Sequence, residues 1–183
     1  EDLVVVSLMD GRVLEGTMRP SSDTPTHLRL YQAFPELGGV VHTHSSFAAA
    51  FAQSGQDVPA LGTTHADHFR GAVPTTRLMT EAEIEGQYEL ETGNVIIETI
   101  DGRTDDALRM PGVLVRSHGP FTWGVDAAAA VVNAIALEAV AAMAERTLSI
   151  DPEAPDIQEA LLRRHFDRKH GPGAYYGQPG DEH

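Results

Sequence analysis

At residues 38–44 this chain carries the stretch GGVVHTH, which decides how its fold and its site are interpreted. Successive side chains of a strand point to opposite faces, so His42 and His44 are expected to point the same way while Thr43 points the other way. Two imidazoles on one face lie close enough to grip a single ligand between them. The stretch therefore predicts an apolar strand that ends in a paired histidine site.

A third histidine, His118, ends a second apolar run at residues 113–117, VLVRS. If both strands belong to one sheet, three neutral imidazoles converge and a fourth coordination position stays open, which is the ligand set of a catalytic rather than a structural zinc. The alternative is that each histidine is a core residue hydrogen-bonded to the backbone. The close pair favours a metalloenzyme, because one shared cation satisfies ring nitrogens that would otherwise each need a partner.

The composition limits both the fold and the partners. A length of 183 residues suits one domain, long enough to bury a core without crosslinks. There is no cysteine, so any metal must be held by nitrogen and oxygen atoms. Thirteen Lys and Arg against 27 Asp and Glu give a net charge of -14 with no basic run, which leaves no electrostatic footprint for nucleic acid. An anionic small substrate would need positive charge from a metal or from backbone N–H groups.

Targeting signals are not expected either. No stretch approaches the ~20 apolar residues of a membrane span, and no basic segment precedes an apolar leader. These features, with the lack of cysteine, suit a soluble, cytoplasmic protein with no membrane partner. The chain opens with Glu1 and enters a strand pattern at once, so we expect a chain that lacks its N-terminal segment.

The rest of the chain interleaves strands with helices, which indicates a layered α/β domain. We expect a hairpin at 3–16, helices at 27–34, 47–53, 157–169 and from 81 toward 91, and a long apolar helix from the Asp126 cap to Arg146. Residues 59–68 fit a functional loop or a broken strand, and 101–110 a polar linker. The state of residues 95–97 stays open between helix and strand.

Five motifs occur in order along the chain, at residues 20–27 (PSSDTPTH), 38–45 (GGVVHTHS), 62–67 (GTTHAD), 110–121 (MPGVLVRSHGPF) and 170–178 (HGPGAYYGQ). Together they resemble the L-ribulose-5-phosphate 4-epimerases of the class II aldolase and adducin-head family. The resemblance covers nearly the whole chain. It implies a three-layer α/β/α domain with a central mixed, largely antiparallel sheet, a divalent metal such as zinc or Mn2+, and a cyclic homotetramer with active sites between subunits.

The activity implied by the resemblance is the interconversion of L-ribulose 5-phosphate and D-xylulose 5-phosphate in pentose and arabinose catabolism. The C3–C4 bond is broken and remade. Retro-aldol cleavage leaves an enediolate of dihydroxyacetone, whose charge a zinc ion chelating the C2 and C3 oxygens would stabilise as a Lewis acid. Glycolaldehyde phosphate then rotates and re-adds on its other face.

The resemblance also assigns residues. It gives His42, His44 and His118 to the metal and places Asp23 beside it, as a ligand or a close neighbour with a catalytic role. The alternative for Asp23 is that it only caps the helix after Pro25.

Proton transfer and phosphate binding are assigned in the same way. Asp67 and Tyr176 resemble the family's acid/base groups on opposite faces of the substrate, with Tyr176 reaching an adjacent subunit on the tail at 171–183. Ser21 and Ser22 resemble phosphate contacts. Without the resemblance, Asp67 fits a loop carboxylate and the tail a chain end with no core to join.

One departure and two alternatives remain. Members of the family carry roughly fifty further residues before the hairpin, including a lysine and loops that hold the phosphate, so 1–183 is expected to be a single domain without that segment. A class II sugar-phosphate aldolase is the first alternative, although such aldolases resemble one another in carrying Glu where this chain has Asp23. A non-catalytic assembly domain like the adducin head is the second, and the intact histidines speak against it.

Overall fold

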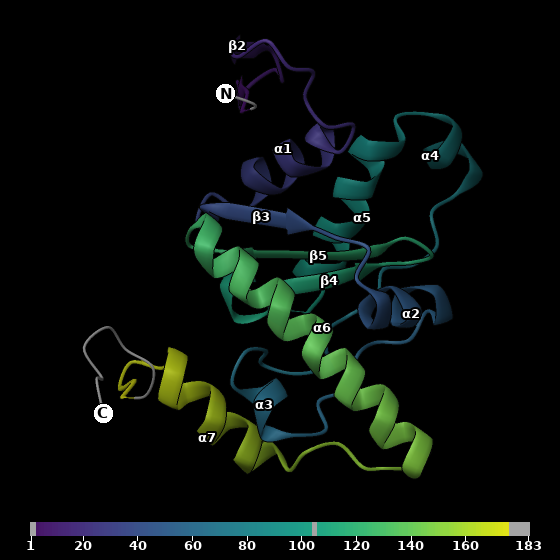
Figure 1. Cartoon of the computed structure of the whole chain (residues 1–183), viewed down its shortest axis with the longest axis vertical. Helices are drawn as coiled ribbons and strands as arrows, with labels where there is room; N and C mark the ends of the chain where they lie inside the picture. Colours follow the sequence, from purple (N-terminus) through teal and green to yellow (C-terminus); the bar gives the residue numbers. More distant parts are fainter. Residues whose placement is uncertain (1–2, 104–105, 176–183) are drawn as a thin grey trace.

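The histidine stretch lies in a three-stranded antiparallel sheet at the centre of the molecule (Figure 1). The structure, a computed structural model, describes residues 3–103 and 106–175. Strands β3 (Gly39–His42), β4 (Gly112–Val115) and β5 (Gly119–Gly124) have the spatial order β3-β5-β4. All residues of β4 and β5 are buried, as expected for a sheet covered on both faces.

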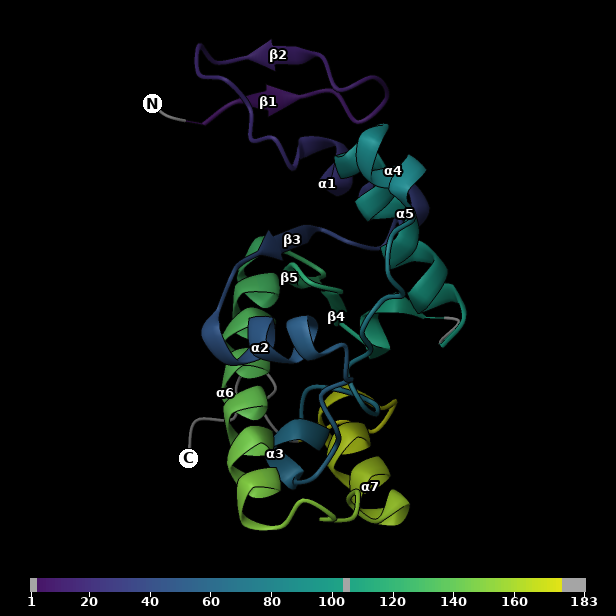
Figure 2. The same cartoon turned by 90° about the vertical axis from the view of Figure 1, so that its right-hand side faces the viewer.

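Helices cover both sides of this sheet (Figure 2). Helices α6 (Ala127–Ile150) and α2 (Ser46–Ser54) pack against it from one side, and the pair α1 (Thr24–Ala33) and α5 (Tyr88–Asp101) lies on the other. The core between them contains fully buried side chains of Leu30, Ile96, Leu114, Phe121, Trp123 and Leu137. The layers are those of an α/β/α domain.

The predicted helix starts are largely confirmed. The Asp126 side chain accepts a hydrogen bond from the Ala129 N–H at 2.7 Å and caps α6. Pro25 lies in the first turn of α1, where its missing N–H costs nothing. The capping box of Thr80 and Glu83 is present and opens α4 (Glu81–Glu85).

Three segments differ from expectation. The helix after Thr80 ends at Gly86 and a separate helix, α5, continues to Asp101, so residues 95–97 are helical. Gly93 lies inside α5, where α1 packs closely against it: a Cβ there would lie 2.7 Å from Arg29 Cβ. The expected loop at 59–68 contains the short helix α3 (Thr63–Ala66), and the linker contains the 3-10 helix η1 (Ala107–Arg109).

Helix α6 corrects the expectation that nothing approaches a membrane span. Among the described residues it is the one helix long and apolar enough to cross a membrane by length and composition. Core helices of soluble proteins meet the same criterion, and α6 packs against β3, β5 and α2 along one side. Its exposed side carries Val131, Val132, Ile135 and Met143.

Two outlying parts flank the central layers (Figures 1 and 2). The hairpin of β1 (Val5–Val6) and β2 (Val13–Glu15), which the Asp-Gly turn predicted, lies beyond α1. At the opposite end, α7 (Glu159–His170) packs against α3 beside the C-terminal half of α6. The sheet and α2 therefore separate the α3–α7 pair from α1 and the hairpin.

Candidate metal centre

Three histidine side chains converge where β3 ends and β4 turns into β5. The Nε2 atom of His44 lies 3.1 Å from Nε2 of His42 and 3.1 Å from Nε2 of His118. One ring nitrogen from each of the three lies within 4.8 Å of the others. The structure thus brings together the three residues that the sequence predicted as ligands.

The strands place these rings, although two of the three lie outside regular strand. His42 pairs with Phe121 of β5, and its ring stacks on the Phe121 ring at a centroid distance of 4.1 Å. His44 follows the end of β3, and His118 is the last residue of the turn between β4 and β5. Simple strand alternation therefore predicted the convergence but not the backbone that produces it.

Gly119 permits the close approach of the two chain segments. A Cβ at this position would lie 2.8 Å from the Thr43 carbonyl oxygen and 3.5 Å from the His44 ring. Any side chain there would push β3 away from the start of β5. Beside it, Ser117 has a φ of 63°, the left-handed conformation in which the turn delivers His118. Among the described residues, no other non-glycine residue has a positive φ.

The hydrogen bonds of the rings leave lone pairs facing one another. His42 Nδ1 lies 2.9 Å from the Pro120 carbonyl oxygen, and because a carbonyl only accepts, this nitrogen carries the proton. Nε2 of His42 therefore presents a lone pair to the triad. At most two protons are left for three nitrogens in contact, and a cation resolves this arrangement by accepting all three lone pairs. The residues fit a divalent metal.

Burial favours the neutral form of two of the three rings, His42 and His118. Desolvation lowers the pKa of His42, opposed by its bond to Pro120 and by the charge of Asp23. Burial also lowers the pKa of His118, as do the neighbouring His42 and His44, while Asp23 raises it. Neutral imidazole is the form that binds a metal, so burial prepares His42 and His118 for a cation.

Asp23 lies beside this triad and is available to it. The residue occupies the cap position of α1, yet its side chain makes no capping hydrogen bond. Its charge acts on the pKa of His27, His42 and His118. The carboxylate is therefore free to face the histidines, which counts against the alternative that it serves only as a cap.

Ser21 and Ser22 precede Asp23 and are exposed. The Ser21 hydroxyl accepts a hydrogen bond from the Asp23 N–H at 3.2 Å, and the Ser21 carbonyl accepts one from the Thr24 hydroxyl at 2.6 Å. These bonds fold the chain into a tight turn at the start of α1. Both serines thus lie at the start of α1, the end of a helix that favours anions, and Ser21 lines a cleft with Met9 and Leu28.

Asp67 lies in a different place. Its carboxylate accepts two hydrogen bonds of 2.9 Å from Arg168 and lies 3.0 Å from His165 Nδ1 and 3.8 Å from Lys169 Nζ. These residues all belong to α7, and the α3–α7 pair is remote from the triad (Figures 1 and 2). Although burial raises the pKa of Asp67, the bonds from His165 and Arg168 outweigh it and lower the pKa overall. Within one chain the structure does not bring Asp67 to the histidines.

The remaining assignment falls outside the structure: Tyr176 lies outside the described residues, and so does the tail beyond residue 175.

Two residues, one that contacts the triad and one that caps the helix following it, were missed by sequence reasoning. Tyr88 contacts His118 at 3.3 Å through its hydroxyl, and no sequence signal marked it. Glu138 accepts hydrogen bonds from the Phe47 and Ala48 N–H groups at 3.0 Å and so caps α2, the helix that begins just after His44. A signal existed for Glu138, because it is the one acidic residue in the apolar stretch 127–144.

Three converging histidines at one end of a sheet between helical layers define an α/β/α domain whose histidine triad could bind a divalent metal. A family model described as "Class II Aldolase and Adducin N-terminal domain" matches residues 1–144, and the chain belongs to this family.

Individual proteins agree with this membership. "L-ribulose-5-phosphate 4-epimerase UlaF" of Salmonella paratyphi B is 57% identical over 178 residues, which are 97% of this chain and 77% of that protein. The protein of the same name from Salmonella typhi gives the same identity and coverage, 57%, 97% and 77%.

Solved structures confirm the fold class. An "L-fuculose 1-phosphate aldolase" has a TM-score of 0.71 at 19% identity, over 90% of this chain and 70% of that one. The l-fuculose-1-phosphate aldolase from Thermus thermophilus has a TM-score of 0.60 at 19% identity, over 81% of this chain and 70% of that one. At these identities the likeness concerns the fold alone.

Proposed function

We propose that this chain is a metal-dependent epimerase that interconverts L-ribulose 5-phosphate and D-xylulose 5-phosphate. The observation that carries the proposal is the convergence of three histidine Nε2 atoms, in a chain 57% identical to proteins named as this epimerase. The aldolase alternative has no such support, because the aldolases among the solved structures share the fold at low identity. An adducin-like assembly role would leave the triad without a purpose.

His42, His44 and His118 would hold the cation, zinc or another divalent ion such as Mn2+, with Asp23 as a fourth ligand or close neighbour. When bound, the cation supplies Lewis-acid stabilisation of negative charge on the oxygens of the substrate. The Pro120 carbonyl fixes the tautomer of His42, which leaves Nε2 of that ring available to the cation. Asp23 adds a negative charge that balances part of the charge of the ion.

The reaction at C4 needs two proton-transfer groups. On cleavage, the C4 hydroxyl loses its proton, its oxygen becomes the aldehyde of glycolaldehyde phosphate, and the C3–C4 electron pair stays with the three-carbon fragment. After the aldehyde rotates, C3 attacks its other face and the new C4 oxygen takes up a proton. Groups on opposite faces are needed because the proton leaves on one side and returns on the other. Asp67 and Tyr176 are the proposed pair.

Asp67 would act at the triad of a neighbouring chain. Its described contacts are with α7, away from the histidines of its own chain. It lines a cleft that also exposes the apolar side chains of Val125 and Val132 at the start of α6. A second subunit could cover these side chains and bring its own triad to the carboxylate.

The assembly we propose is a cyclic homotetramer with active sites between subunits. The apolar exposed side of α6 supports it, since residues such as Ile135 gain by burial in an interface. The tail at 171–183 would reach the neighbouring site and carry Tyr176 into it. Ser21 and Ser22, at the start of α1, would contact the substrate phosphate.

This function places the protein in the cytoplasm, in the catabolism of pentoses such as arabinose. The single-domain organisation over 1–183 is part of the same proposal.

The direct test is turnover. The zinc-loaded protein is incubated with L-ribulose 5-phosphate, and D-xylulose 5-phosphate is detected by a coupled assay. We expect epimerisation with no net release of glycolaldehyde phosphate. Cleavage of a ketose 1-phosphate without any epimerisation would instead identify an aldolase and overturn the proposal.

A further inference from the structure

One hydroxyl reaches the triad from outside it. Tyr88 is the first residue of α5, and its hydroxyl oxygen lies 3.3 Å from Nδ1 of His118. The other nitrogen of that ring, Nε2, lies 3.1 Å from Nε2 of His44. We propose that Tyr88 is a positioning residue, which holds His118 in the orientation and tautomer needed for cation binding. The inference rests on the proposed metal site and deepens it.

His118 and His42 differ in the group that hydrogen-bonds to Nδ1 of each ring. The Pro120 carbonyl can only accept, so it fixes the His42 proton on Nδ1. A tyrosine hydroxyl both donates and accepts, so it satisfies either tautomer of His118. Before a cation binds, a proton on His118 Nε2 can be shared with His44 Nε2 while the Tyr88 hydroxyl donates to Nδ1. With a cation bound, His118 would carry its proton on Nδ1 and donate a hydrogen bond from it to the Tyr88 hydroxyl, so the ring keeps its place.

The backbone that carries Tyr88 is tied to α1. The Thr26 hydroxyl donates a hydrogen bond of 2.6 Å to the carbonyl of Glu89, the residue after Tyr88. Thr26 is fully buried, so this bond is protected from water. Because α1 also carries Asp23, the same helix pair delivers both Asp23 and Tyr88 to the histidines.

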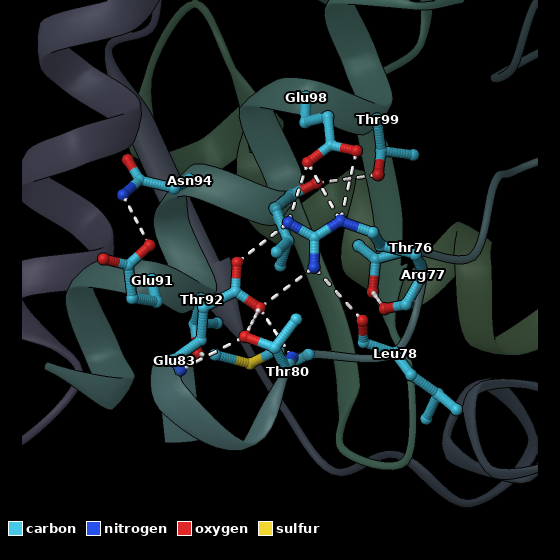
Figure 3. Close-up of polar contacts among 12 residues, drawn as sticks. Thr76, Arg77, Leu78, Thr80, Glu83, Glu91, Thr92, Asn94, Glu98 and Thr99 are labelled. Carbon is cyan, nitrogen blue, oxygen red and sulfur yellow. Dashed lines mark hydrogen bonds and ion pairs between the residues drawn. The ribbon is translucent and has the colours of Figure 1, made fainter. Parts of the chain in front are cut away.

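An ion-pair clamp holds the chain on both sides of Tyr88 (Figure 3). Arg77 binds Glu83 in α4 at 2.9 Å and Glu98 in α5 at 3.0 Å. The Arg77 bond and the bond from the Thr80 backbone lower the pKa of Glu83 to about 2, so the clamp stays charged at neutral pH. Glu83 precedes Tyr88 and Glu98 follows it, and the clamp thereby fixes where α5 begins.

The neighbouring Thr76 supports His118 from a second direction. Its hydroxyl accepts a hydrogen bond of 3.0 Å from the Arg116 N–H, two residues before His118. The segment from Thr76 to Glu98 thus holds both the backbone leading to His118 and the far nitrogen of its ring. If Tyr88 served only to pack, its hydroxyl would not need to lie at Nδ1 of His118.

The test removes only the hydroxyl. Zinc affinity is measured by competition with a chromogenic chelator for the wild-type chain, Tyr88→Phe and the control Tyr31→Phe. Tyr31 is a matched control because its hydroxyl bonds to the backbone of Val40, on the strand of His42, without touching a ligand. We expect Tyr88→Phe to lose about 10- to 100-fold in zinc affinity and to alter the visible spectrum of the cobalt-loaded protein. The unfolding midpoint of the metal-free chain should stay unchanged.

The outcomes separate this inference from the proposed function. Wild-type zinc affinity and an unaltered cobalt spectrum in Tyr88→Phe would overturn the role of Tyr88 and leave the metal site intact. An equal loss in Tyr31→Phe would overturn it too, because the effect would then be structural. A wild-type chain that binds neither metal would overturn the metal site itself, and the inference with it.

Discussion

At the triad, the Nε2 atoms of His42, His44 and His118 lie in contact, with too few protons to satisfy all three. At Asp67, by contrast, one carboxylate receives hydrogen bonds from Arg168 and lies within reach of His165 and Lys169. Both groups are clusters of titratable side chains. The first has unshared lone pairs and lacks a positive charge. The second has its negative charge balanced by its own helix α7.

The difference indicates what each region still needs. Lone pairs that face one another are costly unless a cation takes them, so in the proposed function the triad is completed by a metal ion. The Asp67 cluster is complete as a structure, and α7 orients its carboxylate without any ligand. In the proposed function, a proton-transfer role for Asp67 requires that another chain's triad be brought to it.

The largest expected effect is on activity in mixed oligomers. His44→Ala should abolish activity through loss of the metal, and Asp67→Asn should reduce kcat by about 10²- to 10⁴-fold through loss of a proton-transfer group. If the site combines the triad of one chain with Asp67 of another, mixing the two variants restores complete sites. Random exchange at equal amounts predicts recovery of about a quarter of wild-type activity.

Activity assays before and after subunit exchange, with exchange verified by mass spectrometry of tagged chains, measure this recovery. Verified exchange without any recovered activity would show that Asp67 serves its own chain, and the contrast between the two regions would then fail.

A smaller effect concerns stability at the Asp67 cluster. Asp67→Asn in the metal-free protein should lower the free energy of unfolding by about 2 kcal/mol at neutral pH, because it removes charge-assisted hydrogen bonds to Arg168. The folded-state pKa of Asp67 is lowered from 3.8, so its stabilisation is present above that pH and is lost as the pH falls through the folded pKa. Urea unfolding across pH should show the two proteins converging in acid. A gap that persists at the lowest pH would contradict the ionic origin.

A still smaller effect is expected beside the triad. Glu138→Gln should lower the free energy of unfolding by about 1 kcal/mol, since an amide caps α2 less well than a carboxylate. Burial raises the pKa of Glu138, but the Ala48 and Phe47 N–H groups outweigh it and lower the pKa overall. This difference should therefore be present above the ordinary value of 4.5 and be lost as the pH falls through the lower folded pKa. Glu145→Gln, on an exposed part of the same helix, is the control and should change stability by less than about 0.5 kcal/mol. Equal losses in both variants would remove the special role of Glu138.

Much of the triad region could be predicted from local sequence. The apolar run before His42 and the second histidine at position 44 indicated a strand and a cation shared by the two rings. The structure confirms that the rings converge. The path of the backbone could not be predicted, because it depends on Gly119 allowing the Thr43 carbonyl to approach. Tyr88 was missed for a related reason: its contact with His118 arises from packing between distant segments.

The helices show the same limit. Asp126 and Thr80 mark helix starts through short-range capping, which sequence patterns capture well. Gly93 inside α5 is explained instead by the close packing of α1, which leaves no room for a side chain there. The position of Asp67 could not be inferred either, since its partners on α7 lie about a hundred residues further along the chain, as in the separation of 101 from Arg168.

The most direct measurement of the central claim is the zinc content of the purified protein and its variants by elemental analysis after dialysis. The three converging Nε2 atoms predict one zinc per chain in the wild type, loss of most of it in His44→Ala, and full retention in Asp67→Asn, whose cluster is complete without metal. Full zinc occupancy in His44→Ala would contradict the account.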